Sequence, residues 1–423
     1  EKQANSLEQI LKAKSQGFAS NKELSYKDIQ QQLKADEAAI TIIKEDQTLS
    51  DTSYITEYVA LVLKKTDAFP TLIRIASSND FETTYVNEYI NHMYDRVEDA
   101  DSYNRFWKPI AAKLQGITKV YLSADGVYNQ VNLYTLQNPV TKKYVLDEVN
   151  VSVLPNLSYM LNDTKSNTQH SAELYGFPDY DYDFSKKVSM PVASEPLASS
   201  RYGLFKLVPL PGTKIEVENI AQFLQNTKWN VNMYQKELAS EEQLKKTVSP
   251  KVLHIATHGY FLKDIYDRED KSFLGFEEYK IKNNLLLQSG IMLAGASKSA
   301  KDTTNSVAQD GIFTAYEASL LNLSNTDLVV LSACETGLGQ DMNNQGVFGL
   351  QRAFYIAGAK NLIMSLWSVD DDATQILMTE FYKEWSVNPT QQFIAKAFNK
   401  AQREVRKKYP HPYYWGAFVL LGN

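Results

Sequence analysis

The stretch that most constrains the fold is a short apolar run that ends in a cysteine. Residues 328–331 are four consecutive apolar side chains, followed by the small residues Ser332 and Ala333 and then by Cys334. Such a run is typical of a central strand of a parallel sheet, buried on both faces. In open α/β sheets, ligands bind at the carboxyl ends of these strands. The sequence therefore places Cys334 where a binding or catalytic site is expected.

A second stretch is built in the same way. Residues 252–257 read as a buried strand, and His258 and Gly259 follow directly. If both strands belong to one parallel sheet, His258 and Cys334 emerge at the same edge. His254 shares the strand parity of His258, and we expect it to be a core residue.

Cys334 is the single cysteine among 423 residues, so it has no disulfide partner within the chain. A lone cysteine is usually an inert core residue. The paired histidine favours the alternative, in which His258 takes the thiol proton and the thiolate attacks a carbonyl carbon. The backbone N–H groups of Gly259 and Cys334 are candidate donors to the oxyanion.

Strand and helix patterns alternate along the chain, which predicts a doubly wound, mostly parallel α/β sheet with helices on both faces. The predicted strands are 38–45, 53–64, 70–76, 119–123, 172–178, 205–208, 229–234, 251–257, 361–367 and 417–421, and the predicted helices include 81–95, 99–114, 214–226, 240–247, 344–357, 371–386 and 390–408. Thr213 and Glu216 read as a capping box, Ser25 and Asp28 read as another, and Ser240 reads as the N-cap of the helix 240–247. Residues 285–293 could form a hairpin, and the polar stretch 260–310 is typical of long functional or disordered loops.

Several ordered motifs resemble one known family. They are 256–259 (Ala-Thr-His-Gly), 331–337 (Leu-Ser-Ala-Cys-Glu-Thr-Gly), 346–350, 357–359, 365–371 and 414–418. This set resembles the CHAT family of caspase-like cysteine peptidases, related to caspases and separase and often found downstream of TPR repeats. The resemblance is strong over 205–423 and weaker over 26–180.

The resemblance implies a division into two related subdomains. Residues 26–180 would be a degenerate, non-catalytic caspase-like subdomain, 181–204 a linker, and 205–423 the catalytic subdomain. Residues 1–25 are either a terminal helix or a remnant of upstream helical repeats. His258 and Cys334 match the family's catalytic dyad.

Asp371 is a candidate substrate-binding residue. It resembles the acidic residue that lines the primary specificity pocket of separase, which implies a preference for Lys or Arg before the scissile bond. The simpler interpretation is that Asp371 stabilises the N-terminus of the helix that begins there.

Composition excludes several classes of protein. The net charge of −6 argues against direct nucleic-acid binding, and no apolar run has the length of a membrane helix. His254 and His258 do not form the helical zinc motif, so we expect neither a metal nor a cofactor. A tyrosine phosphatase would need an arginine at position 340, where the chain has Gln340. One cysteine is compatible with a reducing, cytoplasmic location.

The sequence therefore predicts a cysteine endopeptidase that hydrolyses a specific protein partner through an acyl-enzyme. The family's association with TPR regions implies gating by another protein or by a nucleoprotein complex, and bacterial defence is a plausible context. The first alternative is a catalytically silent caspase-like interaction or scaffold module. The second is a thiol hydrolase that acts on a small molecule, for which the sequence offers no ligand-binding motif.

Overall fold

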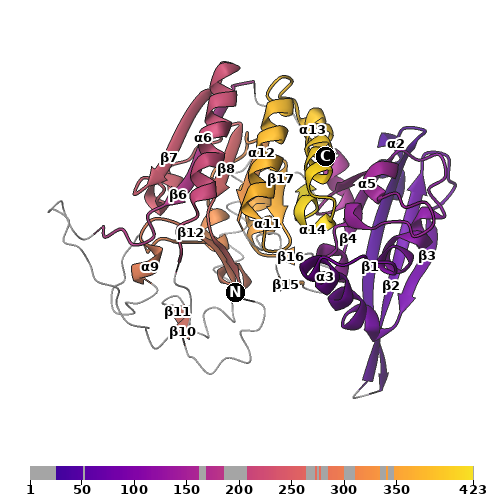
Figure 1. Cartoon of the computed structure of the whole chain (residues 1–423). Coiled ribbons are helices and arrows are strands. Elements are labelled where there is room, and N and C mark those ends of the chain that lie inside the picture. Colours follow the sequence, from indigo (N-terminus) through magenta and orange to yellow (C-terminus); the bar gives the residue numbers. More distant parts are fainter. Residues whose placement is uncertain are drawn as a thin grey trace, which may run out of the picture.

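The computed structural model describes residues 25–50, 53–161, 168–184, 207–262, 284–299, 310–333 and 347–422, together with the strand pairs at 272–273, 276–277 and 340–341. Cys334 and the predicted helix in residues 1–25 lie outside the described residues. Most of the linker 181–204 lies outside them as well. The described chain is a layered α/β structure built on one large sheet (Figure 1).

Eleven strands of the described chain form this sheet, in the order β3-β2-β1-β4-β5-β18-β17-β14-β8-β6-β7. They are β1 (Glu37–Ser50), β2 (Ser53–Lys64), β3 (Thr71–Ser77), β4 (Lys119–Ala124), β5 (Asn150–Val153), β6 (Ser171–Pro178), β7 (Asn230–Lys236), β8 (Val252–Ala256), β14 (Leu328–Ser332), β17 (Leu362–Ser365) and β18 (Phe418–Leu421). The strands from β1 to β5 form the N-terminal half of the sheet, and the others form its C-terminal half.

Helices cover both faces, as the alternating pattern predicts. The described helices include α2 (Tyr26–Gln32), α3 (Thr84–Asp95), α4 (Lys108–Ala111), α5 (Val145–Glu148), α6 (Pro211–Asn226), α7 (Glu241–Lys245), α9 (Ala296–Ser299), α10 (Ala315–Ala318), α11 (Leu350–Ile356), α12 (Asp371–Trp385), α13 (Gln391–Lys408) and α14 (Pro412–Trp415). In the C-terminal half, α6, α12 and α13 cover the face turned toward the viewer in Figure 1. Helices α7, α10 and α11 pack against the other face.

The parallel strands of the C-terminal half are buried from end to end. Every residue of β8 and of β14 is buried, and alternate side chains enter the cores on the two faces of the sheet. A polar side chain on such a strand would lose its contact with water, so strands buried on both faces need near-continuous runs of apolar residues. This explains why the two runs before His258 and Cys334 were readable in the sequence.

The pairing of β6 differs from the predicted division at residue 180. β6 pairs in parallel with both β7 and β8, so it belongs to the C-terminal half of the sheet. The sequence signal for the strand was correct, but the choice of partner strands depends on contacts with residues 58–80 positions further along the chain. Most other predicted ranges lie within a few residues of the elements described above, but two predicted helices are shorter. In 344–357, strand β16 (Val347–Phe348) precedes α11, and in 99–114 a π-helix (Tyr103–Trp107) precedes α4.

Three local predictions are wrong. Leu207 and Val208 are not in a strand, because the Val208 carbonyl bonds to a side chain and Pro209 cannot donate to a ladder. Helix α6 begins at Pro211, three residues before the predicted start, so Thr213 and Glu216 make no capping box. Thr213 instead accepts a hydrogen bond from the Phe177 N–H at 3.0 Å.

The third error concerns the hairpin at 285–293. This stretch contains a single turn of 3-10 helix (Leu285–Leu287) followed by β12 (Ser289–Met292), which lies between β9 (Gly259–Phe261) and β13 (Ile312–Thr314) in a small antiparallel sheet. Gly290 is required by a close approach, since a Cβ there would lie 2.6 Å from the Tyr260 ring. The strands that pair with β12 lie 20 or more residues away in the chain, so patterns among neighbouring residues do not reveal them.

Candidate functional site

The candidate site lies at the carboxyl ends of two adjacent strands. β8 and β14 are neighbours, they run parallel, and their register pairs Ala256 with Ser332. The Thr257 N–H donates to the Ser332 carbonyl at 3.2 Å, which extends the pairing by one residue. His258 is two positions beyond Ala256, and Cys334 is two positions beyond Ser332. The two chains therefore leave the sheet side by side, one residue before each predicted catalytic position.

His258 is half-buried at this rim. Its Nε2 lies 2.8 Å from the Val208 carbonyl oxygen. A carbonyl can only accept, so a neutral His258 ring must carry its hydrogen on Nε2, which leaves the Nδ1 lone pair available as a base. The ring also packs against Tyr180, with centroids 5.3 Å apart. The loop before α6 thus fixes both the orientation and the tautomer of the imidazole.

Hydrogen bonds from Tyr180 and Met292 fix the turn that carries His258. The Tyr180 hydroxyl lies 2.9 Å from Thr257 Oγ1, and burial raises the pKa of Tyr180 to about 12, so the phenol stays neutral. The Met292 N–H donates to the His258 carbonyl at 2.8 Å. Gly259 is partly exposed and pairs with Ile291 of β12. These contacts attach the turn to the small sheet β9-β12-β13.

On the other strand, Ala333 is the last described residue before Cys334. Its carbonyl accepts a hydrogen bond from the Ser365 hydroxyl of β17. The chain entering the predicted nucleophile is therefore anchored on both sides, by β8 and by β17.

A buried polar group lies directly beneath the rim, on the face covered by α6 and α12. His254 is fully buried, with Nε2 3.0 Å from Glu216 Oε1 and Nδ1 3.2 Å from the Tyr382 hydroxyl. Ser332 donates to Glu216 Oε2 at 3.1 Å. His254 is a core residue, as predicted, but Glu216 is a link between β8, β14 and α6 that the capping-box interpretation missed.

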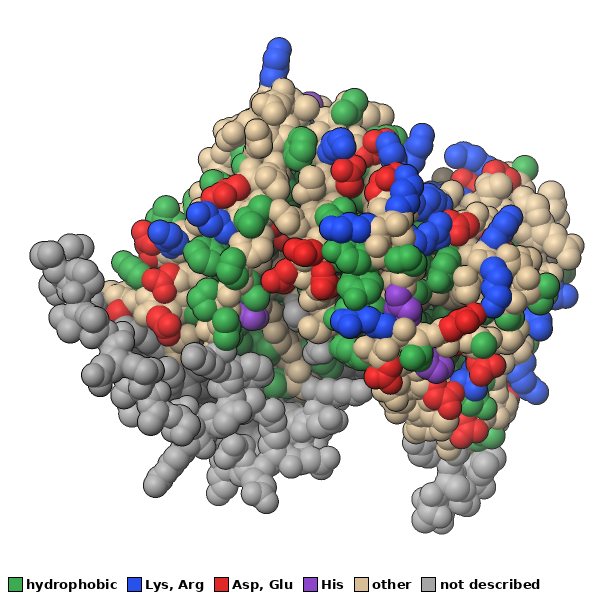
Figure 2. Space-filling view, viewed as in Figure 1, with side chains coloured by type: hydrophobic (Ala, Val, Ile, Leu, Met, Phe, Trp, Pro, Cys, Tyr) green, Lys and Arg blue, Asp and Glu red, His purple; other side chains and the backbone are tan. Residues whose placement is uncertain are grey.

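Asp371 lies at the start of α12, on the other side of the loop that contacts His258. It is exposed, and a Cβ on Gly212 would lie 3.4 Å from the Asp371 Cβ. The preceding residue, Asp370, caps the helix by accepting from the Ala373 N–H at 2.9 Å. Within the described part of the chain, no lysine or arginine pairs with Asp371. Figure 2 shows acidic side chains gathered near the middle of the displayed face, close to where α6 and α12 begin.

The comparison with protein families decides the membership of this chain. A model of the CHAT domain matches residues 102–423, which is most of the chain. The chain belongs to the CHAT family. Its fold is mixed α/β, with one large and mostly parallel sheet and helices on both faces.

Curated relatives of this CHAT chain are repeat proteins. It is 31% identical over 109 residues to tetratricopeptide repeat protein 28 of Mus musculus, covering 25% of this chain and 4% of the relative. For the Homo sapiens protein the values are 32% over 121 residues, 27% and 4%. The matched segment is thus a small part of the length of these relatives.

Two solved structures are distant structural neighbours of the CHAT chain. The Arg-specific cysteine proteinase gingipain R has a TM-score of 0.44 at 9% identity, covering 77% of this chain and 70% of that one. Separase in the Saccharomyces cerevisiae separase–securin complex has a TM-score of 0.49 at 9% identity, covering 93% and 30%.

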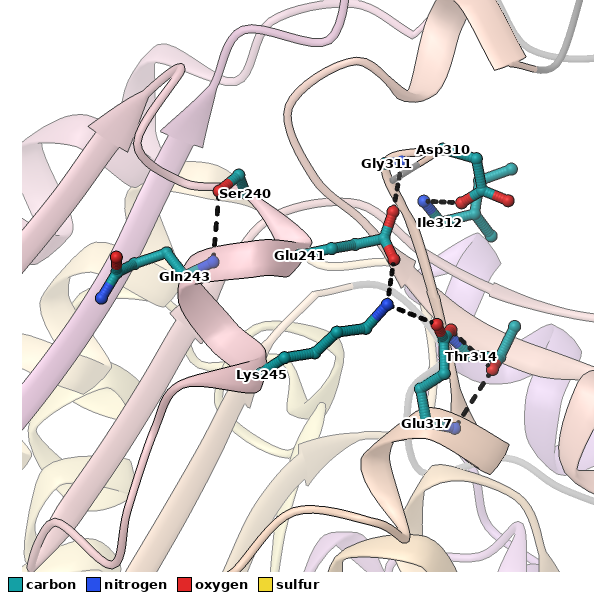
Figure 3. A network of polar contacts seen from close by, with 9 residues as sticks. All are labelled: Ser240, Glu241, Gln243, Lys245, Asp310, Gly311, Ile312, Thr314 and Glu317. Carbon is teal, nitrogen blue, oxygen red and sulfur yellow. Dashed lines mark hydrogen bonds and ion pairs between the residues drawn. The ribbon is translucent and has the colours of Figure 1, made fainter. Parts of the chain in front are cut away.

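A second charged network supports the small sheet next to the CHAT rim (Figure 3). Lys245 of α7 lies 2.8 Å from a carboxylate oxygen of Glu241 and 2.8 Å from one of Glu317. Glu241 also accepts from the Gly311 N–H at 2.5 Å, which ties α7 to the start of β13. Burial, and after it the nearby Asp310 carboxylate, raise the pKa of Glu241 to about 7, against the opposing effect of Lys245.

The described residues contain neither a metal-binding cluster nor a membrane-spanning helix. No group of three or more His, Cys, Asp or Glu side chains there is arranged to hold a metal ion. None of the helices in that part of the chain combines the length and the apolar character that crossing a membrane requires.

Proposed function

We propose that this chain is a cysteine endopeptidase that uses Cys334 as nucleophile and His258 as base. The observation that carries the proposal is the register of β8 and β14, which brings the chain to the same height one residue before each of the two positions. Side chains two residues apart on a strand share a face. Ala256 and Ser332 face the α6 side, and continued alternation would direct His258 and Cys334 to that side together.

The chemistry follows from the tautomer of His258. With Nε2–H donated to Val208, Nδ1 would take the thiol proton as sulfur attacks the scissile carbonyl carbon. The N–H groups of Gly259 and Cys334 would stabilise the oxyanion of the tetrahedral intermediate. The imidazolium then protonates the leaving amine, and water hydrolyses the acyl-enzyme with His258 again acting as base. The products are two shorter peptides.

Asp371 is the proposed recognition group for a basic residue before the scissile bond. Support comes from the exposure of Asp371 and from the absence of a side chain at Gly212 beside it. The loop 207–210 and the first turn of α6 connect His258 to Asp371. A lysine or arginine side chain could approach its carboxylate without displacing an existing ion pair with a described residue. The Asp371→Asn variant should lose about 10-fold in kcat/KM for Arg substrates and little for substrates with an apolar residue at that position. Equal losses for both substrates would assign Asp371 to helix capping alone.

The substrate is proposed to be a specific protein partner, and the activity to be gated by an upstream TPR region or by another protein or nucleoprotein complex. The repeat-protein names of the curated relatives support the TPR context. A cytoplasmic role in bacterial defence is part of the same proposal.

The decisive test is active-site labelling. A fluorescent peptidyl acyloxymethyl ketone with arginine next to the reactive group should modify Cys334 of the full chain, with the site mapped by mass spectrometry. His258→Ala should abolish labelling. His170→Ala is the matched control, because His170 is an exposed histidine next to the opposite, amino end of β6.

A second measurement identifies the substrate. Expression of the chain in cells should produce new protein N-termini, identified by mass spectrometry, that do not appear when the Cys334→Ala variant is expressed. If neither labelling nor cleavage occurs, with or without that proteome, the chain is a silent interaction module.

A further inference from the structure

One face of the N-terminal half of the sheet is covered at one end only. The side chains of β1 and β2 alternate between two faces. On the first face, the opposed pair Ile40 and Val62 is fully buried in the core that includes α3 and α4. On the second face, the opposed pair Ala39 and Leu63 is buried beneath α2 and the 3-10 helix Leu157–Leu161. Further along the same strands, the side chains of the second face become partly exposed.

The partly exposed stretch is apolar. Ile43 and Val59 lie opposite each other in β1 and β2, and Leu61 and Leu72 lie opposite each other in β2 and β3. The first three are partly exposed, and Leu72 is 65% exposed. None of the four belongs to, or packs against, a core cluster of the described residues. We call these four side chains the apolar strip.

The sequence of β2 indicates that the apolar strip has a cover. Residues 59–63 are five consecutive apolar side chains. Such a run is typical of a strand buried on both faces, whereas a strand with one face in water alternates apolar and polar residues. β8 and β14 have the same kind of run, and every residue in them is buried. Contiguous exposed apolar side chains mark a contact surface, and the described residues do not supply what covers this one.

The segment that precedes α2 joins the fold beside the apolar strip. α2 packs on the same face of the sheet through Ile29 and Leu33. It begins next to the turn between β2 and β3, where the ring centroids of Tyr26 and Phe69 are 6.3 Å apart. Phe69 is 72% exposed, and Leu72 of the apolar strip follows three residues later. The 24 residues before Ser25 therefore reach the sheet at this end of the strip.

The sequence of this segment matches an apolar surface. Leu7, Ile10 and Leu11 recur at helical spacing within residues 4–15, which predicts an amphipathic helix. Such a helix is about 18 Å long, and the strip crosses three strands spaced about 4.8 Å apart. Residues 16–24 can span up to about 30 Å, which is enough to let the helix lie over the strip. The other nearby segment, 162–167, is polar throughout and has no apolar side chain to offer.

We propose that residues 4–15 form a helix that docks Leu7, Ile10 and Leu11 on the apolar strip. The second face of the N-terminal half is then covered by two helices, this one and α2. The segment is therefore part of this domain and not a remnant of upstream helical repeats. This proposal does not depend on the proposed peptidase activity, because it concerns the half of the sheet without His258 and Cys334.

Photo-crosslinking of the full chain tests the contact. In the Leu72→p-benzoylphenylalanine variant, irradiation should crosslink position 72 to residues 4–15 of the same monomer, with the linked peptides identified by mass spectrometry. The control position is Val140, which is 87% exposed in a loop that contacts Tyr103 on the first face of the sheet. It should give no link to residues 4–15. A crosslinked dimer would assign the strip to a second copy of the chain, and a monomer without the expected link would leave the segment undocked. Either result overturns the proposal.

Hydrogen exchange tests the same contact without altering the strip. The double variant Leu7→Ser, Leu11→Ser removes the apolar face of the segment, so the amides of β2 and β3 should exchange about 10-fold faster because their local opening is no longer opposed. The matched variant Gln9→Ser, Lys12→Ser changes the opposite face of the same helix and should exchange like the wild type. Exchange rates that are equal in the wild type and both variants would show that residues 4–15 do not cover the strip.

Discussion

The two halves of the sheet share a parallel-strand pattern but differ at their rims. In the N-terminal half, β4 is followed by Gly126, and a Cβ there would collide with the Tyr58 hydroxyl. That hydroxyl accepts from the Val127 N–H at 3.0 Å, so an aromatic side chain closes the edge. In the C-terminal half, β8 is followed by His258, whose Nε2 is bonded and whose Nδ1 is left as a base. Similar strand ends thus carry an aromatic packing contact in one half and the proposed catalytic base in the other.

The layers beneath the two rims differ in the same sense. Tyr58, Phe81, Phe106 and Tyr128 form an aromatic cluster in the N-terminal half, with the Phe81 and Phe106 centroids 4.9 Å apart. The C-terminal half has the polar group of His254, Glu216 and Ser332 in the corresponding layer. An apolar layer holds its shape without specifying directions, whereas a buried polar group fixes the directions of the elements it joins. We infer that the N-terminal half contributes stability to the fold, whereas the C-terminal half positions β8 and β14 relative to each other.

The largest difference between the halves should appear in chemistry. His258→Ala should lower the second-order rate of Cys334 labelling by about 10³ or more, because the general base is lost. His92→Ala, in helix α3 of the N-terminal half, is the matched variant and should change the rate less than two-fold. Stopped labelling reactions followed by gel fluorescence measure both. A comparable loss of labelling rate in both variants would show that the two halves do not differ in their contribution to the chemistry.

The next largest effect should appear in stability. Phe106→Ala empties a fully buried site in the aromatic cluster and should lower the free energy of unfolding by about 3–5 kcal/mol. Urea denaturation followed by tryptophan fluorescence measures the change. At a temperature where the variant is fully folded, its labelling rate should equal that of the wild type. A slower rate in the folded variant would mean that the N-terminal half contributes to the chemistry.

Removal of Glu216 should affect both stability and rate. Glu216→Ala leaves His254 Nε2 and the Ser332 hydroxyl unpaired in the core, which should cost about 2–3 kcal/mol of unfolding free energy. Glu216→Gln keeps the shape and the acceptor for Ser332, so it should lose less stability and recover most of the labelling rate. The two variants are compared by urea denaturation and by labelling at one pH. If Gln and Ala behave alike, the carboxylate acts by filling space and not by positioning β8 and β14.

The smallest effect concerns Glu241 and the pH. Because burial raises the pKa of Glu241 to about 7, the folded state holds this proton more tightly than the unfolded chain does. The stabilisation that comes from this tighter proton binding by Glu241 is present at acidic pH and is lost as the pH rises through about 7. The urea midpoint should therefore fall between pH 5.5 and 7.5, and Glu241→Gln should reduce that fall by roughly 0.3 M.

The charged groups that face Glu241 are Lys245, Asp310 and Glu317. Glu317→Gln is a useful comparison, since the Glu317 carboxylate also contacts Lys245 but is partly exposed. A fall in the midpoint that is identical in the wild type and in Glu241→Gln would assign the pH dependence to other groups.

The sequence predicted those parts of the fold that depend on neighbours along the chain. The capping box of Ser25 and Asp28 is present at the start of α2, with the Asp28 carboxylate 2.9 Å from the Ser25 N–H. Ser240 caps α7 by accepting from the Gln243 N–H, also as expected. His254 was correctly assigned to the core by strand parity alone. Each of these results depends on periodicity or on contacts three residues apart.

The errors occur where a residue is used by a distant partner. Glu216 has the spacing of a capping box, yet its carboxylate is directed to His254 and Ser332, which lie 38 and 116 positions further along the chain. Val208 has the character of a strand residue, but its carbonyl binds the ring of His258. Local propensity is a weak preference that such tertiary contacts override.

By itself the sequence determined the strand and helix order and the two positions, His258 and Cys334, at which chemistry is expected. Burial on both faces forces apolar runs, and a polar or nucleophilic residue directly after such a run stands out. The tertiary structure alone decided that β8 and β14 are neighbours and that Val208 selects the tautomer of His258. Those features are contacts between residues far apart in sequence, and only the packed chain brings such residues within hydrogen-bonding distance.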